Sequence, residues 1–153
     1  MATAYLTDEE FRVCTKMPPE DLDALELRRP GFIRARLLMR SAEINGRLAK
    51  RYAVPFAAPY PEIVTLWLTG IVTLDGYEAL GFSPASEQDG RIVEGAKSAW
   101  DALKEAADSE EGLYDLPLRA NTSASGIERG GPLGYSEAGP YDWMARQSEA
   151  VRN

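Results

Sequence analysis

The feature that most constrains this fold is one long segment, from Gly31 to Tyr52, in which apolar residues recur with the period of an α-helix. On a helix of about 100° per residue, one arc of this segment is mostly apolar and the opposite side is basic. Pro55 then stops the helix. We therefore expect a helix over 31–52 with one buried face, against which the other segments pack. The apolar arc holds Ile33, Leu37, Ser41, Ile44, Asn45, Leu48 and Tyr52, and the basic side holds Arg36, Arg40, Arg47 and Lys50, with Glu43 among them.

Shorter signals indicate four more helices, at 7–15, 19–28, 61–77 and 86–108. Thr7 and Glu10 have the spacing of a capping box, and Pro19 suits the first turn of the next helix. The segment 61–77 is apolar almost all round, which is typical of a central helix, whereas 86–108 has one clean apolar arc. The sequence thus predicts an all-α fold, a small helical bundle of about four to five helices. Its expected core includes Ile44, Leu48, Trp67, Ile71, Trp100 and Leu103.

The composition changes at Gly112, so we divide the chain into a helical domain, 1–112, and an extended C-terminal arm, 113–153. From Arg119 to Pro140 the arm is rich in Gly, Ser, Asn and Pro, and it has too few apolar residues to offset the entropy lost on folding. Aromatic residues nevertheless follow near its end. We predict that the arm is mobile in the free chain and becomes ordered on another surface. The residues predicted to bind that partner are Leu116, Pro117, Tyr135, Tyr141, Trp143 and Met144.

The composition also narrows the chemistry open to the chain. It has 153 residues, no histidine, one cysteine (Cys14) and a formal net charge of −7. The absence of histidine excludes Ser-His-Asp and Cys-His catalytic sites, and it excludes a Cys/His zinc site as well. The negative charge argues against a general nucleic-acid binder. We expect that the protein is not an enzyme, that it needs no cofactor, and that Cys14 is a small core residue.

The N-terminus has neither the basic nor the apolar region of a signal peptide. The longest uncharged apolar run, Ile63–Leu74, is well short of the roughly 20 residues that a membrane span needs. We therefore expect a soluble protein that stays in a reducing compartment.

Several blocks of the sequence, taken in order, resemble a known family. They are AYLTDEEF from Ala4, SAEINGRLAKRYAVPF from Ser41, the pattern P-x-x-V-x-x-W-x-x-x-I from Pro61, and a final amphipathic helix that carries a tryptophan. Over about Ala4 to Leu118, this order resembles the head–tail adaptor proteins of long-tailed bacteriophages, also called head-completion or connector proteins. The shared motif is a packing pattern rather than a chemical signature.

This resemblance implies a structural virion protein whose copies assemble as a ring, commonly twelve-fold, under the portal protein. Such a ring joins head to tail, meets a tail or stopper protein, and lets genomic DNA pass without sequence-specific binding. It implies a place at the head–tail interface of the virion after synthesis in the host cytoplasm, and an arm that reaches the portal or a neighbouring subunit. We expect an acidic or polar inner wall. The predicted subunit contacts are therefore Arg36, Arg40, Arg47 and Lys50, facing neighbours instead of the channel.

Other readings of the same residues stay open at this point. The segments Pro19–Leu27 and Gly31–Tyr52 could form a helix-turn-helix that binds DNA, although the length of the second helix, the Pro30-Gly31 break and the net charge of −7 weigh against it. An enzyme is the third class, and no set of residues in the sequence supports it. For the basic side of 31–52, the alternatives to a subunit contact are a solvated surface or contact with DNA.

Overall fold

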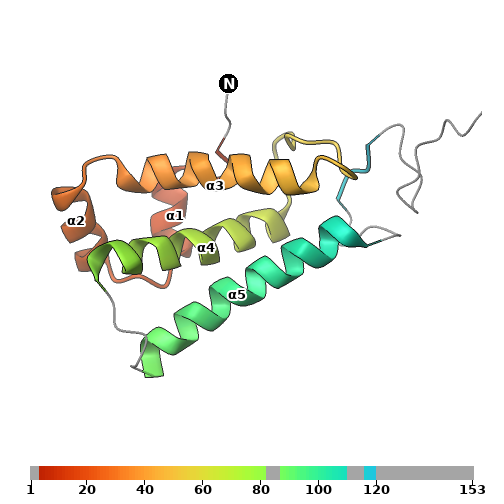
Figure 1. Cartoon of the computed structure of the whole chain (residues 1–153). Coiled ribbons are helices and arrows are strands. Elements are labelled where there is room, and N and C mark those ends of the chain that lie inside the picture. Colours follow the sequence, from red (N-terminus) through yellow and green to blue (C-terminus); the bar gives the residue numbers. More distant parts are fainter. Residues whose placement is uncertain (1–3, 82–86, 110–115, 120–153) are drawn as a thin grey trace, which may run out of the picture.

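The computed structural model describes residues 4–81, 87–109 and 116–119, and these contain five α-helices (Figure 1). They are α1 (Asp8–Cys14), α2 (Pro19–Arg28), α3 (Phe32–Leu48), α4 (Glu62–Leu80) and α5 (Glu87–Asp108). The only β pairing within those residues is one antiparallel bridge between Tyr52 and Leu118. The predicted all-α bundle is confirmed for this part of the chain, while most of the predicted arm, from residue 120, lies outside it.

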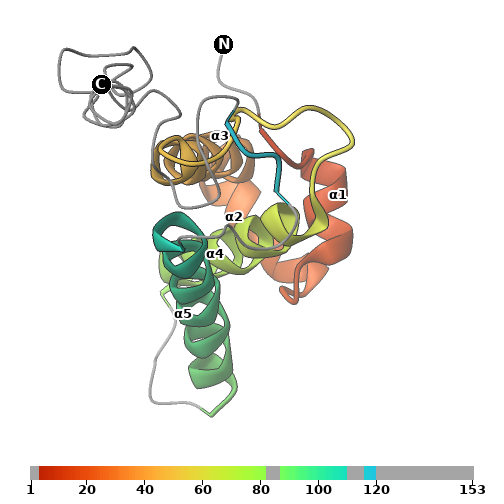
Figure 2. The same ribbon diagram turned by 90° about the vertical axis from the view of Figure 1, so that its right-hand side faces the viewer.

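The helices form a bundle in which α4 is the central element. In Figure 1, α4 lies between α3 above it and α5 below it, and α1 and α2 cover a further side. Helix α4 contacts α5, α3 and α2. Figure 2 shows that the N-terminal half of α5 extends beyond the other helices. The near absence of a polar face on α4 follows from its having neighbours on several sides.

Burial distinguishes α4 from a membrane helix of similar composition. Its 19 residues are long and apolar enough to cross a bilayer, with a mean hydropathy of 1.2. Half of that stretch is buried inside the fold, as expected for the core helix of a bundle. Its buried apolar residues are Val64, Trp67, Leu68, Ile71 and Val72.

Most of the predicted core is confirmed, and two predictions about individual residues are wrong. Ile44, Leu48, Trp67, Ile71 and Leu103 are all buried. Trp100 is only partly buried: it packs against the edge of the core, and its ring also faces two arginine side chains of α3. Cys14 is exposed. Helix α1 instead turns Phe11 into the core, and the Thr15 hydroxyl that follows it lies 2.7 Å from the hydroxyl of Thr73.

Two helix ends differ from their predicted positions. Helix α3 ends at Leu48 instead of Tyr52, because the residues after it turn away and Tyr52 pairs with Leu118. Helix α4 continues past Tyr77 to Leu80 and is ended by Gly81. Gly81 has a φ of 87°, a left-handed conformation that favours glycine at a helix C-terminus.

The short segment 116–119 belongs to the helical domain, although we predicted it to be the start of the arm. The backbone N–H of Ala53 donates to the Pro117 carbonyl at 2.8 Å, and that of Arg119 donates to the Arg51 carbonyl at 2.9 Å. Leu116 is 5% exposed and lies in the core. Leu116 therefore cannot serve as a partner-binding residue, since its own domain already covers it.

The first two blocks that carry the family resemblance pack directly on each other. The backbone N–H of Tyr5 donates to Ser41 Oγ at 3.2 Å, and the Tyr5 hydroxyl donates to Asn45 Oδ1. That hydroxyl also accepts the backbone N–H of Phe56 at 3.1 Å, and burial raises the pKa of Tyr5 above its ordinary value. The predicted capping box at Thr7 is confirmed. It fixes the angle at which the N-terminal segment enters α1.

Candidate functional site

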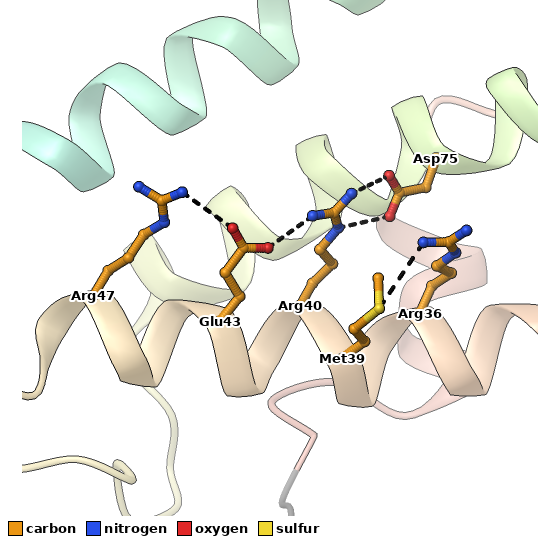
Figure 3. A network of polar contacts seen from close by, with 6 residues as sticks. All are labelled: Arg36, Met39, Arg40, Glu43, Arg47 and Asp75. Atoms are coloured by element: carbon orange, nitrogen blue, oxygen red, sulfur yellow. Dashed lines mark hydrogen bonds and ion pairs between the residues drawn. The ribbon is translucent and has the colours of Figure 1, made fainter.

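The basic side of α3 forms a connected network of charged groups, shown in Figure 3. Arg40 donates to both carboxylate oxygens of Asp75 on α4, from Nε at 2.8 Å and from Nη2 at 2.6 Å. Its third nitrogen, Nη1, donates to Glu43 Oε2 at 2.7 Å. Arg47 donates to the other oxygen of Glu43 at 3.1 Å. The network thus alternates in charge along α3 and crosses to α4 through one bidentate pair.

The pair formed by Arg40 and Asp75 is the buried part of this network. Asp75 is 6% exposed and the Arg40 side chain 22%. A bidentate pair of this geometry is among the stronger charge-assisted contacts, and it also fixes the relative position of its two helices. Hydrogen bonding to Asp75 raises the pKa of Arg40 above its ordinary value, although burial acts in the other direction. Arg40 therefore stays charged at neutral pH, and the pair fastens α3 to α4.

Trp100 extends the same network to α5. The Arg47 guanidinium lies 4.6 Å from the centre of the Trp100 ring, and that of Arg40 lies 5.7 Å from it. Both distances are within the range of cation–π attraction, which is strongest for tryptophan. Three helices, α3, α4 and α5, consequently meet at these charged groups, and Trp100 packs against the core while two cations lie over its ring.

The four residues predicted as subunit contacts do not share one environment. Arg40 is committed to carboxylates of its own chain, and Arg47 is half exposed while it contacts Glu43 and Trp100. The Arg36 guanidinium lies 5.1 Å from the centre of the Phe32 ring. Lys50 is exposed just beyond α3. The subunit contact itself stays a prediction. Arg40, however, already binds two carboxylates of its own chain.

The residues predicted to bind a partner through the arm divide in a similar way. Leu116 is buried and Pro117 is exposed beside the domain. The other four, Tyr135, Tyr141, Trp143 and Met144, lie outside the described residues. The reasoning from sequence also missed Asp75, although one signal was available. Asp75 is an acidic residue inside an otherwise apolar helix, and such a group needs a cationic partner when it is buried.

Glu43 gives the network a testable dependence on pH. Burial acts to raise the pKa of Glu43, but hydrogen bonds from Arg40 and Arg47 outweigh it, and the pKa lies below the ordinary value of 4.5. A carboxyl whose pKa is lower in the folded state stabilises the fold fully above its ordinary pKa. That stabilisation is lost as the pH falls through the folded-state pKa.

We expect Glu43→Gln to lower the free energy of unfolding by about 1 kcal/mol at neutral pH, because it removes the charge between two arginines. The difference from the unchanged protein should shrink below about pH 4.5, where Glu43 becomes neutral in the unfolded and then in the folded chain. Urea unfolding between about pH 7 and pH 3 measures it. Glu105→Gln on the exposed side of α5 serves as the control. A difference for Glu43→Gln that stays constant across this range would contradict the assignment.

Comparison with family models, with curated proteins and with solved structures finds no match to this chain. Among the residues that the structure describes, no group of three or more Cys, Asp and Glu side chains is placed to hold a metal ion. The charged network connects three helices, pairs arginines with carboxylates of the same chain, and leaves Lys50 and Arg47 partly accessible at the surface.

Proposed function

We propose that this protein is a head–tail adaptor of a bacteriophage, a structural virion protein that forms a ring between the portal protein and the tail. The ring joins head to tail and lets genomic DNA pass without sequence-specific binding. The observation that carries this proposal is the contact between the two blocks that resemble the family. Tyr5 of the first block hydrogen-bonds to Ser41 and Asn45 of the second. The resemblance therefore rests on residues that pack on each other within the domain.

The turn between α2 and α3 favours this proposal over a DNA-binding helix-turn-helix. The Glu26 carboxylate accepts the backbone N–H of Gly31 at 2.7 Å and that of Ile33 at 2.9 Å. A recognition helix places the residues of its N-terminus against the bases. Here the N-terminus of α3 is occupied by a carboxylate, which would repel DNA phosphates. The charges of Arg40 and Arg47 are also partly offset by Glu43 and Asp75.

The same contacts refine which basic residues would face a neighbour in the ring. Lys50 is exposed, and the side chain of Arg47 is 48% exposed. Arg36 stacks on Phe32 and is partly exposed. These three are available to an acidic surface of a neighbouring subunit, and Arg40 acts by holding α3 and α4 in place behind them.

Removing the arm tests this proposal. We expect deletion of residues 120–153 to leave the helical domain folded, because residues 116–119, with the buried Leu116, remain in place. Assembly into rings that attach to the portal protein encoded in the same genome should weaken by tenfold or more, whether the arm binds the portal or a neighbouring copy, since aromatic anchors at interfaces often contribute about 2 kcal/mol each. Circular dichroism checks the fold, and negative-stain microscopy with and without the portal checks attachment.

A second variant keeps the full length of the arm and replaces Trp143 by alanine. It should reduce the yield of rings attached to the portal in the same direction as the deletion, without shortening the chain. Unfolding of the domain on deletion would show that the arm is an intramolecular element. Rings that attach to the portal equally well without the arm would remove its proposed role, and absence of any ring or portal complex would count against the adaptor function itself.

A further inference from the structure

A groove of about 360 Å³ lies between α4 and α5. The two helices approach closely at its floor, where a Cβ atom added to Gly70 would be 3.7 Å from Ala99 Cβ and from the Gly95 carbonyl. Cys14 and Lys16, at and after the end of α1, border it. Its walls are mostly apolar and include Ile63, Leu66, Trp67, Ile92, Ala96 and Ala99.

The groove leaves a large apolar side chain open to solvent. Leu66, which lines it, is 65% exposed although it sits on the central helix. Exposed apolar patches rimmed by polar groups are typical of binding sites in soluble proteins. The volume falls within the range of about 300–1,000 Å³ of pockets that hold small ligands, so it can accept one or two large side chains.

We propose that the groove receives the C-terminal segment of a neighbouring copy of this chain, with Trp143 as the anchor and Tyr141 and Met144 beside it. The inference rests on the proposed function, because the ring is what sets copies side by side. The chemistry matches on both sides. The groove offers an apolar wall with Lys16 and Arg91 among its lining residues, and Asp142 lies between the two aromatic residues of the segment.

The point where the arm leaves the domain supports this occupant. Leu118 pairs with Tyr52, whose hydroxyl donates to the Ala106 carbonyl of α5 at 3.0 Å. The lining of the groove on α5 runs from Arg91 to Ala102. At about 1.5 Å per residue, the middle of that stretch is only about 15 Å along the helix from Ala106. A tether of about five extended residues would therefore reach the chain's own groove.

The linker that the chain carries is much longer than that. Residues 120–140 separate the domain from Tyr141, and they are rich in glycine and serine. For a random coil of this length the root-mean-square span is about 25 Å, and fully extended it reaches about 70 Å. A domain of about 100 residues has a radius of gyration of about 13 Å, so two touching domains have centres about 34 Å apart. The linker is thus long enough to reach a groove on the next copy, which a tether of about five residues would not be.

The single cysteine of the chain offers a direct test in the full-length protein, because Cys14 borders the groove. We introduce Ala145→Cys, directly after Met144, and cross-link the assembled protein with a short bismaleimide. The matched control is Ser123→Cys in the linker. If the segment docks on neighbours, Ala145→Cys should give cross-linked multimers at least tenfold faster than Ser123→Cys, and adding Cys14→Ser should abolish them.

Two surface variants locate the docking site. Leu66→Asp places a charge on the groove wall and should remove the cross-link, whereas Leu27→Asp should not, because Leu27 is 85% exposed on α2 and does not line the groove. A cross-link that forms only within one chain would overturn docking on a neighbour. Equal rates for Ala145→Cys and Ser123→Cys, or multimers that persist with Leu66→Asp, would overturn the groove as the site.

Failure of this inference is distinguishable from failure of the proposed function. If microscopy shows rings and portal complexes but no cross-link forms, the groove is not the docking site and the adaptor proposal is unaffected. If cross-linked multimers form in a protein that makes neither rings nor portal complexes, the adaptor function is contradicted instead.

Discussion

Trp67→Ala should lower the free energy of unfolding by about 3–5 kcal/mol, the range measured for large aromatic residues removed from protein cores. Trp67 is 2% exposed and lies on α4, the helix that contacts α2, α3 and α5. The loss combines the transfer free energy of the removed indole atoms with the cost of the cavity that remains. The cavity persists because a closely packed interior relaxes only in part. For a domain of about this size, the melting temperature should fall by about 15 °C or more.

The control for this prediction is Trp100→Ala. Trp100 is partly buried and covered by Arg40 and Arg47, so we expect a loss of only about 1–2 kcal/mol from its cation–π contacts and partial burial. Thermal and urea unfolding, followed by circular dichroism, measure both variants. If Trp100→Ala proved the more damaging of the two, α4 would not be the centre of the fold.

Asp75→Ala should lower the free energy of unfolding by about 3 kcal/mol, because it leaves Arg40 charged and partly buried without its bidentate acceptor. This is the lower end of the range for breaking a buried pair, since Arg40 keeps Glu43 as a partner and its side chain is 22% exposed. Urea unfolding at neutral pH measures the loss. Glu43→Ala should cost less, about 1 kcal/mol, since Glu43 is more exposed than Asp75.

A double variant separates the two contributions to that loss. Replacing both members of a buried pair by apolar residues of similar size is often close to neutral. We therefore expect Arg40→Met with Asp75→Leu to be more stable than Asp75→Ala alone. If the double variant were the less stable of the two, an unpaired Arg40 would not be the cause of the loss in Asp75→Ala.

The sequence predicted local features well because they depend on neighbouring residues. The period of the apolar residues placed the three long helices, and Thr7 with Glu10 and Pro19 placed the first two, with a capping box that the structure contains. It also identified Ile44, Leu48 and Leu103 as core residues. Each of these depends on residues within a few turns of one helix.

Features that depend on distant residues could not be predicted in the same way. Asp75 is 35 positions from Arg40, and no local pattern links the two. The end of α3 was placed too late because Tyr52 pairs with Leu118, which the sequence assigned to the arm. The groove beside Cys14 forms from three helices and has no signature in any one of them. Of the predicted site, only the basic residues and the start of the arm fall where the structure describes them.

The root of the arm determines how the domain responds to force. The chain leaves the domain through the hydrogen bonds that join Pro117 to Ala53 and Arg119 to Arg51. Leu116, just before them, is held in the core. Tension on the arm must break both bonds and extract this side chain before any more of the chain can extend. While these contacts hold, they pass the tension to the residues that follow α3 and to the core around Leu116, and the chain cannot extend towards α5.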